Sequence, residues 1–174
     1  MKYIFYSSVI VLLLVVQSCS IKLSGASIPL EMKTIDVEFF DNNAPLVVNN
    51  LSQTFTEALK QKIRSETRLK IVRTEDADAV LSGSITGYSI APAAVQAPVG
   101  NTQPVATLTR LTITVNVKYV VNLKDPAAKT YAYETSFARF KDYAGDLSSQ
   151  EQALIADINK QLTEDIFNKA FANW

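Results

Sequence analysis

Residues 111–123 read LTITVNVKYVVNL and carry the strongest structural pattern in the chain. Every second position from Leu111 to Leu123 holds an apolar or aromatic side chain, and the positions between are mostly polar, as at Thr112 and Lys118. A period of two is typical of a β-strand that buries one face in a core and leaves the other toward solvent. The stretch therefore predicts a long strand, and the segments around it decide what pairs with it.

Four further segments show the short or alternating apolar pattern of strands. They are residues 34–40, 69–73, 79–90 and 130–143. The last segment follows a turn, places Tyr131, Tyr133 and Phe137 toward the core, and is expected to form a long hairpin with residues 111–123. The second and third segments flank an acidic turn and are expected to form another hairpin.

Two segments have the period of amphipathic helices. Over residues 47–64, apolar side chains recur every three or four positions, and the stretch 42–45 can cap and begin that helix. A second helix is expected from Ser148, which has Glu151 three residues later as in a capping box, almost to the end of the sequence. The order β-α-β-β-β-β-α predicts an α+β fold, with two helices packed on one face of a mostly antiparallel sheet of four to five strands.

The composition limits the available chemistry. The chain has 174 residues, 17 basic and 17 acidic, which indicates one domain without the basic excess of a nucleic-acid binder. With no histidine and one cysteine, it lacks the residues of most nucleophile–base pairs, disulfides and zinc sites. The densest carboxylate group, Glu75, Asp76 and Asp78, is expected to be a solvated corner. We therefore expect no enzyme, no metal and no cofactor.

The N-terminus has the anatomy of a secretion signal. Lys2 precedes an apolar stretch over residues 4–16, which is shorter than the about 20 residues that a membrane-spanning helix needs. Cys19 follows a small residue directly after this stretch, a placement that resembles a bacterial lipobox, in which the thiol carries the lipid anchor. The sequence therefore predicts a cleaved signal peptide over residues 1–18, a lipidated N-terminus and linker over 19–32, and a single domain over 33–174.

Two further features indicate surfaces for binding. Residues 91–105 are uncharged and predict a long loop that either inserts beside another protein or an apolar ligand, or forms a flexible hairpin tip. The prolines of this loop are Pro92, Pro98 and Pro104. Basic residues on the two long strands either gather on the sheet face away from the helices, where they would meet the phosphates of an anionic lipid, or belong to a solvated face. These candidates are Arg110, Lys118, Arg139 and Lys141.

Four features occur together and in a fixed order. They are the lipobox at Cys19, IDVEFF at 35–40 leading into Asn42-Asn43, ADAVLSGSI at 77–85, and the long strand rich in threonine and valine. Together they resemble the LptE family of lipoproteins that assist lipopolysaccharide assembly, most closely its Bacteroidetes-type versions. The resemblance implies a non-catalytic α+β protein that sits as a plug in the lumen of the LptD β-barrel, helps that barrel fold, and is placed to contact lipopolysaccharide.

The resemblance also implies a location in the outer membrane, with the domain facing the periplasm or enclosed in the barrel lumen. Ser20 agrees with this, because an aspartate after the lipidated cysteine marks retention in the inner membrane in many Gram-negative lipoproteins. A second interpretation remains open, in which the protein is a lipoprotein of LpoB-like or CsgG-like type that serves a periplasmic enzyme or a secretion channel as activator or accessory subunit.

Overall fold

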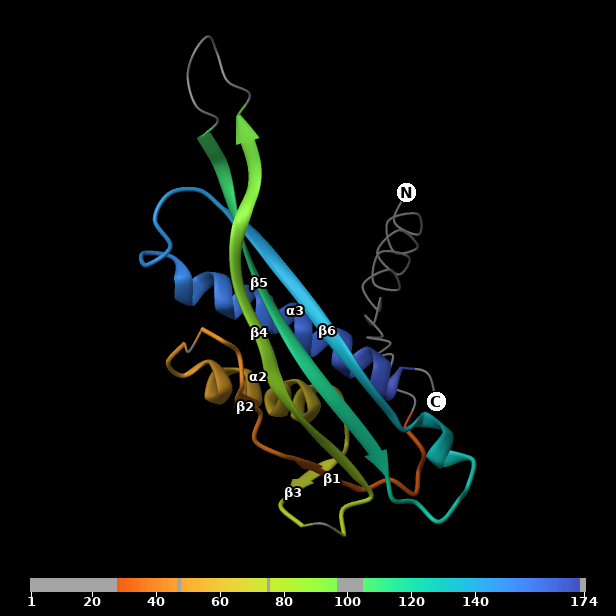
Figure 1. The fold of residues 1–174 in the computed structure, drawn as a ribbon. Coiled ribbons are helices and arrows are strands. Elements are labelled where there is room, and N and C mark those ends of the chain that lie inside the picture. Colours follow the sequence, from red (N-terminus) through yellow and green to blue (C-terminus); the bar gives the residue numbers. More distant parts are fainter. Residues whose placement is uncertain (1–27, 47, 75, 97–104, 173–174) are drawn as a thin grey trace, which may run out of the picture.

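The computed structural model describes residues 28–46, 48–74, 76–96 and 105–172. In this part of the chain, two long helices lie across one face of a mixed six-stranded sheet (Figure 1). The expected α+β fold with two helices packed against a sheet is thereby confirmed. The elements in chain order are β1 (Thr34–Val37), β2 (Asp41–Asn42), α2 (Leu51–Glu66), β3 (Lys70–Val72), β4 (Ala79–Gln96), β5 (Val105–Val121), a 3-10 helix (Ala128–Tyr131), β6 (Tyr133–Tyr143) and α3 (Glu151–Phe171).

The strand expected from the alternating pattern lies at the centre of a three-stranded antiparallel meander. β5 pairs with β4 on one side and with β6 on the other, in a register that sets Val115 opposite both Ile85 and Phe137. The apolar side chains of β5 are buried against the helices. β6 begins at Tyr133, slightly later than expected, because residues 128–131 form the 3-10 helix.

The remaining strands pair in parallel, and the expected hairpin between residues 69–73 and 79–90 is wrong. The sheet order is β3-β1-β4-β5-β6, with β2 beside β4, so β1 lies between β3 and β4 and runs parallel to both. The sheet is consequently mixed instead of mostly antiparallel. Asp78 favours this arrangement, because its carboxylate accepts hydrogen bonds from the backbone N–H groups of Lys33 and Thr34 and holds the chain ahead of β4 against the start of β1.

Both helices begin later than the sequence pattern indicates. α2 starts at Leu51, because Asn50 directly ahead of it takes a left-handed conformation with φ of 63°. The expected capping box is also wrong. The Ser148 hydroxyl donates to a carboxylate in its own loop, and the Glu151 carboxylate accepts a 2.6 Å hydrogen bond from the Tyr88 hydroxyl. The first turn of α3 is therefore tied to β4.

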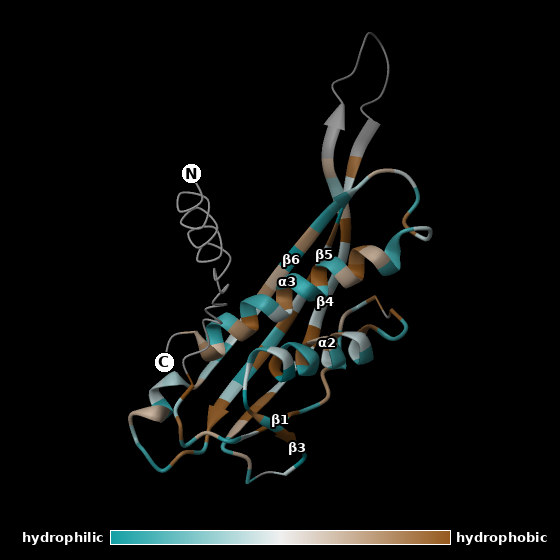
Figure 2. Cartoon of the chain, turned by 180° about the vertical axis from the view of Figure 1, so that it is seen from behind, coloured by the Kyte–Doolittle hydropathy of each residue, from teal (hydrophilic) through white to brown (hydrophobic). Residues whose placement is uncertain are grey.

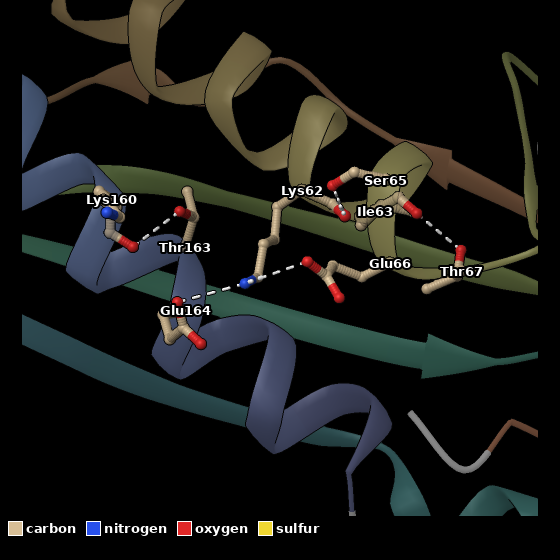
Figure 3. A network of polar contacts seen from close by, with 8 residues as sticks. All are labelled: Lys62, Ile63, Ser65, Glu66, Thr67, Lys160, Thr163 and Glu164. Carbon is tan, nitrogen blue, oxygen red and sulfur yellow. Dashed lines mark hydrogen bonds and ion pairs between the residues drawn. The ribbon is translucent and has the colours of Figure 1, made fainter. Parts of the chain in front are cut away.

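The two helices pack against each other as well as against the sheet. Their inward side chains share one core with β5, whereas the outer side of α2 is mainly hydrophilic (Figure 2). At the surface, the Lys62 ammonium lies 3.2 Å from the Glu164 carboxylate on α3 and 3.9 Å from that of Glu66 on α2 (Figure 3). Met32, in the segment expected as linker, is fully buried in the same core, 3.7 Å from the Tyr119 hydroxyl. Of the helices in the described ranges, none is long and apolar enough to cross a membrane.

The far ends of β4 and β5 project beyond the helices (Figure 1). Residues 91–96 belong to β4 and residue 105 to β5, so the loop expected over 91–105 is shorter than the sequence indicated. Pro92 pairs with Thr109 next to a register shift. Beyond β2, β4 has no described strand on its outer side, so the missing N–H of proline removes no bond from the sheet there.

Candidate functional site on the uncovered sheet face

The helices lie on one face of the sheet, and within the described chain the opposite face has no covering element (Figure 1). Side chains alternate between the two faces, so the positions between the buried apolar residues point to this uncovered face. Most are short, polar and uncharged, and none of the following is buried. They are Ser82, Ser84, Ser89, Thr112, Thr114, Asn116 and Ser136. The uncovered face is thus polar and built from short side chains.

A cluster of a cation, an aromatic ring and a carboxylate lies near the projecting end of this face. The Arg110 guanidinium donates two hydrogen bonds, of 2.7 and 2.9 Å, to the carboxylate of Asp142 on β6. Its central carbon stands 3.7 Å from the centre of the Phe140 ring, which is 47% exposed. The bonds from Arg110 hold the pKa of the Asp142 carboxyl below its ordinary value, so the two charges neutralise each other near pH 7.

Lys118 lies at the other end of the uncovered face. It is exposed and stands opposite Glu134 in the register of β5 with β6. Arg110 and Lys118 are eight residues apart on β5 (118 − 110 = 8), which is about 27 Å along an extended strand. The two basic residues therefore share one face without forming one site.

Arg139 and Lys141 point to the helix side of β6. Arg139 donates two hydrogen bonds, of 2.5 and 2.7 Å, to the carboxylate of Asp165 on α3, and the Lys141 ammonium lies 3.1 Å from the carboxylate of Asp157. The bond to Asp165 raises the pKa of Arg139. These side chains line an open groove of about 440 Å³ between β6 and α3 in which acidic and basic groups alternate. The structure thus brings the four basic candidates to two different faces.

Of the three carboxylates in the turn ahead of β4, that of Asp78 has a structural role. Glu75 lies outside the described residues and Asp76 is exposed, whereas Asp78 accepts three hydrogen bonds of 2.8 to 2.9 Å from the backbone of Lys33 and from the backbone and hydroxyl of Thr34. Partial burial acts to raise the pKa of Asp78, but the hydrogen bonds outweigh it, and the pKa lies below its ordinary value. The solvated corner expected from the sequence is therefore wrong for Asp78. In the described ranges, no cluster of three or more histidine, cysteine or acidic residues is suited to hold a metal ion.

Of the other candidate residues from the sequence, the structure describes only Pro92, which is an exposed residue of β4. The candidates outside the described residues are Cys19, Pro98 and Pro104. The sequence reasoning missed Phe140 and Asp142, which hold Arg110, because it considered basic residues alone. The register of the expected hairpin was the signal available for Asp142, since it sets this residue directly opposite Arg110.

Solved structures share this fold at low sequence identity. A hypothetical protein from Chlamydia trachomatis is 10% identical with a TM-score of 0.53, over 80% of this chain and 98% of the other. A protein from Xanthomonas campestris is 10% identical with a TM-score of 0.53, over 78% of this chain and 82% of the other. At such identities the likeness concerns the fold alone.

The family comparison extends over most of the described domain. No curated protein matches the sequence significantly. The family model described as LptE, lipopolysaccharide-assembly, matches residues 32–170, from the buried Met32 to the last turn of α3. That range contains the whole sheet, both helices and the uncovered face. The chain therefore belongs to the LptE lipopolysaccharide-assembly family.

Proposed function

We propose that this protein is a lipid-anchored outer-membrane component, of the Bacteroidetes type within its family, that fills the lumen of an LptD-type β-barrel during lipopolysaccharide transport. The LptE family is a non-catalytic lipoprotein family, and membership implies a role in lipopolysaccharide assembly. In this proposal Cys19 carries the lipid, and the domain faces the periplasm or lies inside the barrel.

The observation that carries the plug proposal is the uncovered face. The interior of a large outer-membrane barrel is polar and water-lined, so a protein that packs there needs a polar contact surface. Short serine and threonine side chains let a barrel wall approach the sheet closely, while their hydroxyl groups both donate and accept hydrogen bonds. Near this face Arg110 is neutralised by Asp142, which avoids an unpaired guanidinium in a tight contact.

Lipopolysaccharide contact is proposed for the basic residues of the uncovered face. Lys118 is exposed and can meet a phosphate group directly. Arg110 would have to exchange the Asp142 carboxylate for a phosphate, while Phe140 beside it offers an exposed apolar surface to an acyl chain. Arg139 and Lys141 would likewise have to leave their carboxylate partners on α3. Lys118 is therefore the first position to test, and Pro92 at the hairpin is proposed for the barrel contact.

Bulky substitutions on the uncovered face test the plug proposal. Ser89→Trp and Ser136→Trp place a large ring at exposed positions of β4 and β6, where a strand accepts an aromatic residue without unfolding. Both should lower recovery of the barrel partner from detergent-solubilised outer membrane. Ser65→Trp, at an exposed position on α2, is the matched control and should leave recovery unchanged. Full recovery with both sheet variants, or recovery of a peptidoglycan synthase in place of a barrel, would overturn the proposal.

A separate measurement addresses lipid contact. Lys118→Gln should weaken binding of purified lipopolysaccharide to the detergent-solubilised full chain, because it removes the exposed cation. Lys124→Gln, at an exposed lysine in the turn after β5, serves as control. Equal binding by both variants would remove Lys118 from the proposed contact and leave the barrel experiment unaffected.

A further inference from the structure

Leu30 is the most exposed large apolar side chain in the described part of the protein, at 85%. It stands at the tip of a tight turn, which the N–H of Met32 closes by donating to the Pro29 carbonyl at 3.1 Å. The Arg68 guanidinium donates to the carbonyls of Ile28 and Pro29 at 2.8 and 2.7 Å, and Met32 is fully buried. The turn is therefore held on both sides of Leu30, and the exposure of this side chain does not come from a frayed end.

One exposed leucine is ordinary on a protein surface, so its neighbours decide what it can bind. Arg68 contacts the turn directly, Lys33 follows it in the chain, and the Lys33 carbonyl accepts a 2.9 Å hydrogen bond from the N–H of Lys70. These three cations are exposed, and among the described residues none of them forms an ion pair. The segment also carries the exposed carboxylate of Glu31 and holds that of Asp78 through backbone bonds. Within this group, three cations stand against two carboxylates.

The length of chain ahead of the turn limits its distance from a membrane. Cys19, which is proposed to carry the lipid, precedes Ile28 by nine residues (28 − 19 = 9), and nine residues reach about 30 Å even when fully extended. The turn lies at the end of the domain opposite the projecting β4–β5 hairpin (Figure 1). Met32 contacts Tyr119, which packs on Phe171 at the end of α3, so the start of α3 is about 30 Å farther away along the helix. Of these parts, the turn is the one that the anchor keeps beside the bilayer.

We propose that Leu30, Lys33, Arg68 and Lys70 form a membrane-docking surface that rests on anionic phospholipids beside the anchor. Leu30 enters the boundary between headgroups and acyl chains, and the three cations meet the phosphate groups around it. A protein interface is normally built round a buried apolar centre, which a single leucine among cations does not provide. The proposal rests on the lipid anchor of the proposed function and is independent of the barrel contact. It adds that the domain is oriented on the bilayer instead of hanging freely from its lipid.

The test uses the mature lipidated chain, labelled with ¹⁵N, in nanodiscs of phosphatidylethanolamine and phosphatidylglycerol that contain a spin-labelled phospholipid. Paramagnetic broadening should be strong at the backbone amide of Glu31 and absent at that of Ala153, near the start of α3. Replacement of phosphatidylglycerol by phosphatidylcholine should reduce the broadening, because the surface charge of the bilayer is lost. A chain that enters the nanodiscs without broadening at Glu31 would refute the docking surface alone. A chain that does not enter them would refute the lipid anchor and, with it, this contact.

Two matched pairs of substitutions locate the contact. Lys70→Gln should lower the ratio of docked to undocked protein about fivefold, whereas Lys160→Gln, at an exposed lysine of α3, should leave it within about twofold. Leu30→Ser should lower the ratio at least about fivefold, whereas Leu46→Ser, at a leucine that is 51% exposed, should not. Equal effects within either pair would overturn the proposal.

Inorganic phosphate, added to the chain in micelles of a neutral detergent, separates a lipid surface from a site for a small anion. It should produce no saturable shift of the Glu31, Lys33 or Lys70 resonances. Saturable shifts at these positions would make the cluster a small-anion site and would refute the membrane-docking surface.

Discussion

Asp78 shows how one side chain fixes the position of β1 between its two neighbouring strands. Its carboxylate accepts bonds from Lys33 and Thr34, and its own backbone N–H donates to the Thr34 hydroxyl at 3.0 Å. The start of β1 and the start of β4, 44 residues apart in sequence, are thereby joined through reciprocal bonds (78 − 34 = 44). A charge-assisted bond of this kind is stronger than a neutral one.

Asp78→Ala should therefore destabilise the domain by about 1–3 kcal/mol in urea unfolding at pH 7, because three backbone or hydroxyl donors lose their acceptor. Since the folded pKa is lowered, the stabilising effect is present above the unfolded pKa of about 3.9 and is lost as the pH falls through the folded pKa. The difference in unfolding free energy between the wild type and Asp78→Ala should therefore disappear at acidic pH. Asp76→Ala, at an exposed carboxylate of the same turn, is the control, and an equal loss in both variants would contradict the role of Asp78.

Substitution by alanine should destabilise the domain more at Gly83 than at Gly87, although both glycines lie in β4. A Cβ atom at Gly83 would stand 2.1 Å from the Asn116 carbonyl oxygen and 2.8 Å from the Phe40 ring, so Gly83→Ala must displace a backbone group inside the sheet. We expect a loss of about 2–4 kcal/mol in unfolding free energy. At Gly87 the nearest atoms are side-chain atoms of Thr114 at 3.2 Å, and Gly87→Ala should cost about 1 kcal/mol or less. Similar losses at the two positions would show that the sheet adjusts at Gly83.

At the scale of elements, the β4–β5 hairpin combines two environments in one pair of strands. Its lower part is packed between β1, β6 and the helices, and its far part projects with one strand edge open. Exposed Ile90, at 44%, and Leu108, at 38%, lie on this far part. Local opening is expected there first, because few buried contacts support it.

Deletion of residues 92–104 tests whether the projecting part serves binding. The deleted strand residues lie beyond the helices, so the melting temperature should change by no more than about 4 °C, which corresponds to at most about 1 kcal/mol for a domain of this size. Recovery of the barrel partner should fall, because the deletion removes the proposed barrel contact at Pro92. If recovery stays equal while the domain remains folded, the segment is a flexible tip.

The local patterns predicted most elements but not their arrangement. Periodicity is a property of neighbouring residues, so it identified the long strands and both helices. The insertion of β1 between β3 and β4 depends on the bonds of Asp78 to Thr34, which no local pattern contains. The face of β6 on which Arg139 and Lys141 lie could, however, have been predicted from the sequence. Both residues are an even number of positions from Phe137, which the sequence already assigned to the core side, so all three side chains point toward the helix side of the strand.

For the whole molecule, the two layers present different chemistry to the surroundings. The sheet presents short hydroxyl side chains over a broad face, and the helices of the described chain present charged side chains. The proposed barrel contact uses the sheet face, so substitutions on the exposed side of the helices should leave it intact.

The lipid anchor is a prediction about the whole molecule in its membrane. Cys19→Ala removes the only thiol that can be acylated, and the protein should then appear in the soluble periplasmic fraction. Fractionation with an antibody against the domain measures this, and Ser20→Ala is the control for a change beside the cysteine. Unchanged membrane retention of the Cys19 variant would show that another part of the chain provides the attachment.

The place of β1 between two parallel strands has a mechanical consequence. This strand leads the described domain and is bonded on both sides to strands that run in its own direction. Tension applied to the chain ahead of Thr34, while the sheet is held by a partner, acts along β1 and loads its bonds in shear. Bonds loaded in this way must rupture together instead of opening one after another, so we expect the domain to unfold slowly under traction applied from its N-terminal side.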